Sequence, residues 1–142
     1  MRIQKITDRT LVPLFLLTLW SGIKLHVTDY PSAPDDWHTY AVIHSIAGVL
    51  MAILIIMHIR EHWKWYKAVR KPLKVEKARN RRRGVLVLTF LFAAVIATGI
   101  ALLLFVDGAD NHTGLLHFWT GIMASIFAIG HILKRSKQLI HK

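Results

Sequence analysis

Four long runs of apolar residues limit what this chain can fold into. They cover residues 11–27, 40–59, 85–106 and 115–133. Each run is close to the ~20 residues that cross a hydrocarbon layer of ~30 Å as a helix, and the backbone polar groups of a segment inside lipid are satisfied internally by a helix. The sequence therefore predicts an all-α integral membrane protein, a four-helix bundle running up, down, up and down. We expect one transmembrane domain, 1–142, with spans at about 10–27, 38–62, 84–106 and 113–135.

The first run follows a basic start, "MRIQKITDRT", which is also the pattern of a secretory signal peptide. No convincing small-x-small cleavage site follows it at the usual distance. We therefore expect the first run to be a retained span.

The basic residues predict the orientation of the spans. Three Lys and Arg residues precede the first span, eleven lie in the loop from 60 to 83, and four follow the last span. The other two connections, "TDYPSAPDDW" and "DGADNHTG", hold five aspartates and no Lys or Arg. The positive-inside rule then places both termini and the middle loop in the cytoplasm. We expect a multi-pass protein of the cytoplasmic (inner) membrane of a prokaryote.

The same charge distribution argues against a nucleic-acid-binding protein. The sequence pI is about 10.5, but the insertion rule accounts for most of the basic excess, and the chain has no nucleic-acid motif. The chain also has no cysteine, which excludes disulfides, thiolate metal clusters and covalent attachment of a c-type haem through C-x-x-C-H.

The second and fourth runs resemble each other. "IHSIAGVLMAILIIMHI" at 43–59 aligns with "LHFWTGIMASIFAIGHI" at 116–132, with a His, a Gly four residues later and a second His fourteen residues after the first in both. The flanks agree too, since "SGI" at 21–23 resembles "TGI" at 98–100. These matches predict an internal two-fold repeat that relates helices 1 and 2 to helices 3 and 4. The matched residues are His44, Gly48 and His58 in the first copy, and His117, Gly121 and His131 in the second.

The predicted topology places the four histidines at two depths. The second and fourth spans run in the same direction, so His44 and His117 share the outer level, and His58 and His131 share the inner level. Fourteen residues are four turns at the 3.5-residue repeat of a left-handed bundle, so both rings of one helix face the same side. At 1.5 Å per residue the two levels are ~21 Å apart.

Two histidines at one level suit a haem better than a bare metal ion. Zinc wants four ligands, or three and a water, and the predicted spans place no carboxylate or thiol at either level. A haem brings four nitrogens and needs only axial ligands from the protein. Glycine permits close approach of a macrocycle to the backbone, which is the role we expect for Gly48 and Gly121 and also for Gly22 and Gly99. Haem ligation is favoured over a structural role because ionisable groups at membrane depth are costly.

The pattern in "IHSIAGVLMAILIIMHIREHWKWY" resembles the flavinylation-associated cytochrome family, which are small four-helix membrane cytochromes. The ligand spacing is also similar to that of respiratory cytochrome b. The resemblance covers essentially the whole chain, although "HILKRSK" in the fourth helix lacks the W-x-W. It implies two non-covalent haem b groups that carry electrons across the membrane, commonly toward flavin-bearing proteins on the outer side.

The other polar residues of the spans have less specific interpretations. Lys24 either reaches the membrane interface or pairs with the propionates of an outer haem. His62 is expected to be a solvated interfacial residue. Ser45, Ser125 or the i−4 carbonyls would accept the Nδ1–H of the ligands. The cluster of His26, His38 and His112 is consistent with a quinone site, a proton relay or ordinary polar helix ends.

The predicted function is therefore electron transfer through two stacked bis-His haems, within a larger oxidoreductase system and with no catalytic residue of its own. The donor would be a quinol or another donor on the cytoplasmic side, and the acceptor an outer partner such as a flavoprotein. A bound quinone and an oligomer or larger complex remain open. The alternatives are a colourless membrane anchor or metal- or proton-handling bundle, and a quinol-oxidising or ferric-reducing subunit.

Overall fold

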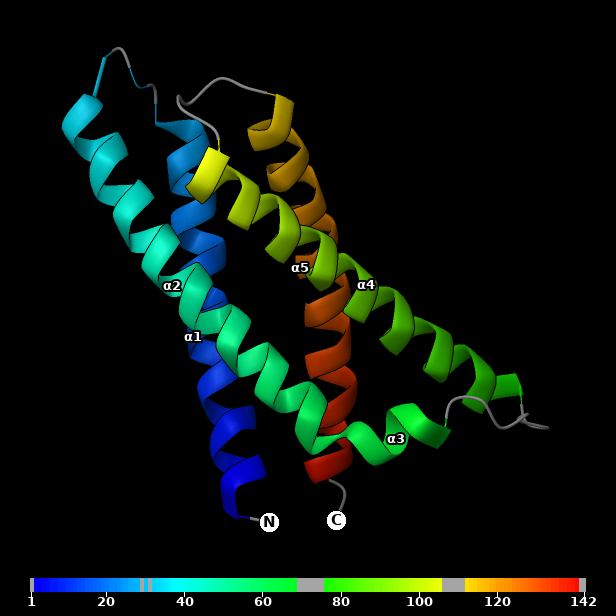
Figure 1. Ribbon diagram of the computed structural model, residues 1–142. Helices are drawn as coiled ribbons and strands as arrows, with labels where there is room; N and C mark the ends of the chain where they lie inside the picture. Colours follow the sequence, from blue (N-terminus) through cyan, green and yellow to red (C-terminus); the bar gives the residue numbers. More distant parts are fainter. Residues whose placement is uncertain (1, 29, 31, 69–75, 106–111, 141–142) are drawn as a thin grey trace. The chain divides into compact units, whose positions relative to one another are not determined.

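The residues that the computed structural model describes are 2–28, 30, 32–68, 76–105 and 112–140, and they form helices and turns but no strand. Their five helices are labelled in chain order in Figure 1. They are α1 (Arg2–Val27), α2 (Pro34–Glu61), α3 (Trp63–Ala68), α4 (Glu76–Phe105) and α5 (His112–Ile140). The predicted all-α class is confirmed for these residues.

Four of the helices are long and apolar enough to cross a membrane. The candidate spans are Ile6–Val27, Pro34–Glu61, Arg82–Phe105 and His112–Lys134. Large apolar side chains point away from the protein along them, for example Phe90 at 73% and Leu104 at 68% exposed. Water would not favour such a surface, whereas lipid covers it without cost. The chain is therefore a multi-pass membrane protein. Residue 106 of the third predicted span and residues 69–75 of the basic loop lie outside the described residues.

The ends of α2 follow from its sequence. Pro34 occupies the first turn, where a missing N–H costs nothing, and Asp35 and Asp36 complement the positive end of the helix dipole. The helix stops at His62, whose N–H binds the carbonyl of His58 at 3.1 Å. The short helix α3 follows directly. It was not predicted, because its six residues are far fewer than those of the apolar runs from which the helices were predicted.

The helices form two compact units. The first unit is Met1–Lys71 and the second is Pro72–Lys142. In the first unit α1 and α2 run side by side in opposite directions (Figure 1), since Ser21 contacts His44 near one end and Asp8 contacts His58 near the other. In the second unit α4 packs against α5.

The interface inside each unit is narrow and rich in small residues. The buried residues among those described are Thr7, Phe15, Ser21, Ala47 and Met51 in the first unit, and Ala124 and Ala128 in the second. Small side chains let membrane helices approach closely. The close approach brings polar groups of one helix against the histidines of the next.

Candidate functional site

His44 contacts two polar groups of the neighbouring helix α1 (Arg2–Val27). Its Nδ1 lies 3.1 Å from the carbonyl oxygen of Thr18 and 3.2 Å from Oγ of Ser21. The Ser21 hydroxyl also donates to the Thr18 carbonyl, at 3.1 Å. A carbonyl can only accept, so Nδ1 of His44 carries the proton and Nε2 carries the lone pair. This is the usual tautomer of a histidine that binds a metal through Nε2.

His117 has a matching contact in the second unit. Its Nδ1 lies 2.9 Å from Oγ1 of Thr98. The Thr98 hydroxyl hydrogen is directed at the carbonyls of Ala94 and Val95, at 2.9 and 3.1 Å. A hydroxyl has one hydrogen to give, so Thr98 accepts from Nδ1–H of His117. The lone pair of His117 is again on Nε2.

Each of these two rings lies against a glycine. A Cβ built on Gly22 would come within 2.8 Å of Cε1 of His44, and one built on Gly99 within 3.1 Å of Cε1 of His117. These glycines directly follow Ser21 and Thr98 in the sequence. We call each hydroxyl residue and its following glycine a hydroxyl-glycine pair. At Gly22 and Gly99 the space beside the glycine is occupied by the imidazole ring, whereas we expected a haem macrocycle there.

Gly48 and Gly121 face open space instead. A Cβ at either position would meet no atom within 4 Å. Gly84 and Gly130 have the same property, so open space alone does not mark a site. One turn from His44 and His117, however, it is compatible with a flat macrocycle beside the backbone. The histidine tautomers and this open space fit a haem.

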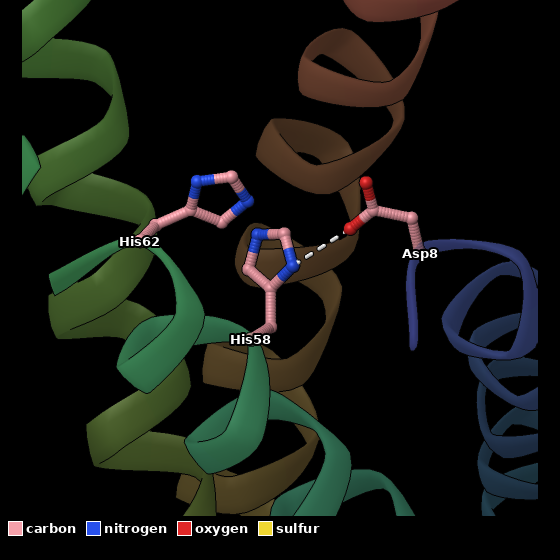
Figure 2. Close-up of side chains that lie close together, drawn as sticks. All are labelled: Asp8, His58 and His62. Atoms are coloured by element: carbon pink, nitrogen blue, oxygen red, sulfur yellow. Dashed lines mark ion pairs between the residues drawn. The ribbon is translucent and has the colours of Figure 1, made fainter. Parts of the chain in front are cut away.

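At the other end of the first unit His58 contacts a carboxylate. Figure 2 shows its Nδ1 directed at Asp8 of α1, with Oδ1 at 2.9 Å. Both side chains are less than a third exposed. His44 and His58 therefore both face α1, fourteen residues apart on one side of α2. The contact at His58 is charged, whereas the contacts at His44 are neutral. Our expectation that no carboxylate lies at either level was therefore wrong for His58, because the helix of α1 extends beyond the predicted span and includes Asp8.

His62 lies next to this ion pair, although we expected it to be solvated. Its ring centroid is 4.6 Å from that of His58. One ligand atom from each of Asp8, His58 and His62 lies within 4.8 Å of the others. Nε2 of His62 is buried and has no hydrogen-bond partner among the described residues. This trio is a possible three-ligand set for a metal ion.

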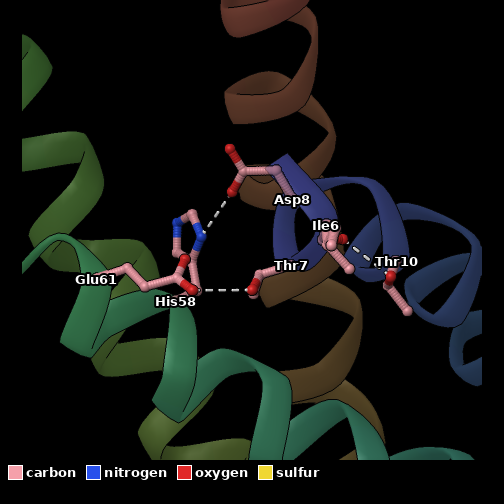
Figure 3. Close-up of polar contacts among 6 residues, drawn as sticks. All are labelled: Ile6, Thr7, Asp8, Thr10, His58 and Glu61. Carbon is pink, nitrogen blue, oxygen red and sulfur yellow. Dashed lines mark hydrogen bonds and ion pairs between the residues drawn. The ribbon is translucent and has the colours of Figure 1, made fainter. Parts of the chain in front are cut away.

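A second polar contact joins α1 to α2 at the same level. Thr7 donates to Oε1 of Glu61 at 2.9 Å (Figure 3), and the Thr7 side chain is buried. This hydrogen bond and the Asp8–His58 pair together join the two helices at that end.

Aromatic side chains gather at the opposite end of the first unit. Tyr30, Trp37 and His38 contact each other edge to face, with ring centroids 5.2 to 5.8 Å apart. Lys24 lies 6.0 Å from the ring centroid of Tyr40. His38 is thus part of an aromatic cluster, and His112 belongs to the other unit.

Sequence reasoning missed the Nδ1 partners of the histidines. Ser125 donates to the carbonyl of Gly121 in its own helix, at 2.8 Å. The observed partners come from the neighbouring helix. The likeness of "SGI" to "TGI" could have indicated the hydroxyl-glycine pairs. Nothing in the sequence indicated that Asp8 contacts a histidine, apart from its being acidic in a basic segment. The two units are described separately, so the pairing of His44 with His117 and of His58 with His131 stays a prediction.

No protein-family model matches the chain, and no curated protein or solved structure shows significant similarity to it.

Proposed function

We propose that this protein transfers electrons across a membrane through two haem b groups, each held by two histidines. The observation that carries the proposal is the common arrangement at His44 and His117. In both units a group of the neighbouring helix accepts a hydrogen bond from Nδ1–H, and the imidazole ring packs against a glycine. Such partners orient an imidazole and set its tautomer for ligation through Nε2. A histidine with only a structural role would not require both the Nδ1 partner and the glycine contact, and the two occur together in both units.

The proposed ligand sets follow the sequence repeat. His44 and His117 would hold the outer haem, and His58 and His131 the inner one. Gly48 and Gly121 would make room for the macrocycle, and Lys24 would pair with an outer propionate. This assignment includes the up-down-up-down topology, the two-fold repeat and the cytoplasmic location of both termini. It agrees with the resemblance to the flavinylation-associated cytochromes.

The residues of the chain would orient and insulate the cofactor. Haem b supplies one-electron oxidation and reduction when it is bound. The two outer imidazoles are oriented by hydrogen bonds from Nδ1–H, which Thr18 and Ser21 accept from His44 and Thr98 accepts from His117. A haem held by two histidines would favour electron transfer over the binding of small ligands at iron. Electrons would come from a quinol or a cytoplasmic-side donor and leave to an outer partner, for which a flavoprotein is our candidate.

The pyridine haemochrome assay on the purified protein tests this function. We expect a red protein with a b-type difference spectrum and two haems per chain. His44→Ala and His58→Ala should each leave one haem, because each removes an axial ligand. His38→Ala is the control and should keep both, since His38 lies in the aromatic cluster. A protein that stays colourless after haem is supplied would contradict the proposal.

A second candidate function is a metal-handling bundle, and the trio of Asp8, His58 and His62 favours it. Two imidazoles and one carboxylate form a common ligand set for a divalent cation. This candidate predicts a colourless protein that binds about one Zn²⁺ per chain, with binding lost in His62→Ala. The haem proposal predicts that His62→Ala keeps both haems.

A further inference from the structure

The partner of His58 differs in charge from the described partners of the outer histidines. Nδ1 of His58 faces the carboxylate of Asp8 at 2.9 Å. Nδ1 of His44 faces a carbonyl and a hydroxyl, and Nδ1 of His117 faces a hydroxyl. All three contacts come from the neighbouring helix of the same unit. Only the contact at His58 brings a negative charge to the ring.

We propose that Asp8 is a positioning residue that sets the potential of the inner haem below that of the outer haem. The inference rests on the proposed function, since it needs His58 to be an axial ligand. It goes beyond that function because it makes the two haems unequal and names the residue responsible.

The direction of the effect follows from the charge. A carboxylate oxygen 2.9 Å from Nδ1 places a negative charge beside the imidazole, which makes the ring a stronger electron donor to a metal that it binds. A stronger donor stabilises ferric iron more than ferrous iron and therefore lowers the reduction potential. Asp8 is only partly exposed, so water screens its charge incompletely.

The sequence repeat does not supply the same group to the second unit. The register that matches Ser21 with Thr98 places Val85 at the position of Asp8. The register that matches His58 with His131 places Lys134 at the position of Glu61. At these two aligned positions the second unit therefore has no acidic residue. A downhill step from the inner to the outer haem would follow from this one-sided charge.

Asp8→Asn is the variant that tests the proposal. An amide has nearly the same shape as a carboxylate, so the change removes the charge and keeps an oxygen close to Nδ1 of His58. Potentials are measured by redox titration of the b-type absorbance. The substitution is made in His44→Ala, which should keep only the inner haem, and in His58→Ala, which should keep only the outer one.

We expect Asp8→Asn to make the inner haem at least tenfold easier to reduce, an upward shift of about 59 mV for one electron. The outer haem should shift by much less. Glu61→Gln is the matched control, because it neutralises a carboxylate at the same helix end that accepts from Thr7. Its effect on the inner haem should also be smaller. If a single-haem variant does not fold, the titration of Asp8→Asn in the otherwise unchanged chain should show one of two components moving.

Three results would overturn the inference. They are an unchanged inner potential, equal shifts of both haems, or an equal shift from Glu61→Gln, which would indicate a general charge effect. In all three the chain with both histidines unchanged still binds two haems, and the proposed function stands. A chain that binds no haem would instead refute the proposed function. If the chain binds one divalent ion at Asp8 and no haem, the proposed function and this inference are both wrong, and the metal-handling function is supported.

Discussion

The two units are alike at one end of their helices and different at the other. In both, a hydroxyl-glycine pair on the first long helix contacts a histidine of the second long helix, which is His44 in one unit and His117 in the other. At the other end the first unit has Asp8, Thr7 and Glu61, where the sequence register gives the second unit Val85, Gly84 and Lys134. The comparison shows that two copies of a repeat can carry histidines at matching positions and still differ in the charge of the side chains near them. We expect similar binding but different potentials at the two levels.

The largest effect should come from removing two histidines at once. His44→Ala with His117→Ala removes both ligands of one proposed haem and should leave the other. His44→Ala with His58→Ala removes one ligand from each and should leave none. Haem content per chain, measured by the pyridine haemochrome assay, separates the two. Equal loss in both double variants would mean that the histidines do not pair across the units.

The hydroxyl-glycine pairs are compared by adding a methyl group to each glycine. Gly22→Ala would place Cβ 2.8 Å from the His44 ring, and Gly99→Ala would place it 3.1 Å from the His117 ring. Overpacking costs about 1–3 kcal/mol, which corresponds to haem binding weakened by about fivefold to about 150-fold. Haem titration should show the larger loss for Gly22→Ala. Gly84→Ala, which meets no atom within 4 Å, is the control and should bind normally.

The neutral contacts should matter less for the potential than the charged one. Ser21→Ala and Thr98→Val each remove a hydroxyl that accepts from Nδ1–H, so the imidazole becomes a weaker donor and the outer potential rises. We expect a shift below about 59 mV, less than a tenfold change in the one-electron equilibrium. Redox titration measures it. Thr98→Ser keeps the hydroxyl and should resemble the unchanged protein, and a shift larger than that of Asp8→Asn would reverse the proposed ranking.

The smallest effect concerns stability. Thr7→Val removes the hydrogen bond to Glu61 and should lower the free energy of unfolding by about 1 kcal/mol. Thr10→Val is the matched control, because the Thr10 hydroxyl binds the carbonyl of Ile6 in its own helix (Figure 3). Thermal unfolding in detergent compares the two. If Thr10→Val lowers the free energy of unfolding as much as Thr7→Val does, the hydrogen bond between Thr7 and Glu61 adds no stability beyond that of a hydrogen bond within one helix.

The helices could be predicted to within a few residues of their membrane-crossing parts. The prediction of 38–62 corresponds to Pro34–Glu61, and that of 113–135 to His112–Lys134. The extensions beyond the membrane, such as the start of α4 (Glu76–Phe105) at Glu76, were not predicted. Those residues are charged, and apolar length says nothing about where a solvated helix begins.

The surroundings of the histidines could not be predicted in the same way. Ser45 and Ser125 were candidates because they are close in sequence. The observed partners, Ser21 and Thr98, lie 23 and 19 residues from their histidines. Which residue of one helix meets a residue of the next depends on the rotation of both helices about their axes. A single sequence without the packed pair does not specify that rotation.

The sequence by itself determined that the chain forms membrane-crossing helices and that two of these carry histidines fourteen residues apart. The helices follow from local physics, because the backbone in lipid must bond to itself and the apolar runs have the required length. The spacing of the histidines is read directly from the sequence. Only the tertiary structure decided that α1 gives His44 a carbonyl and a hydroxyl, and gives His58 a carboxylate. The packing of small and apolar side chains such as Ala47, Phe15 and Met51 sets the rotation of α1 against α2, and that rotation selects which side chains face the rings.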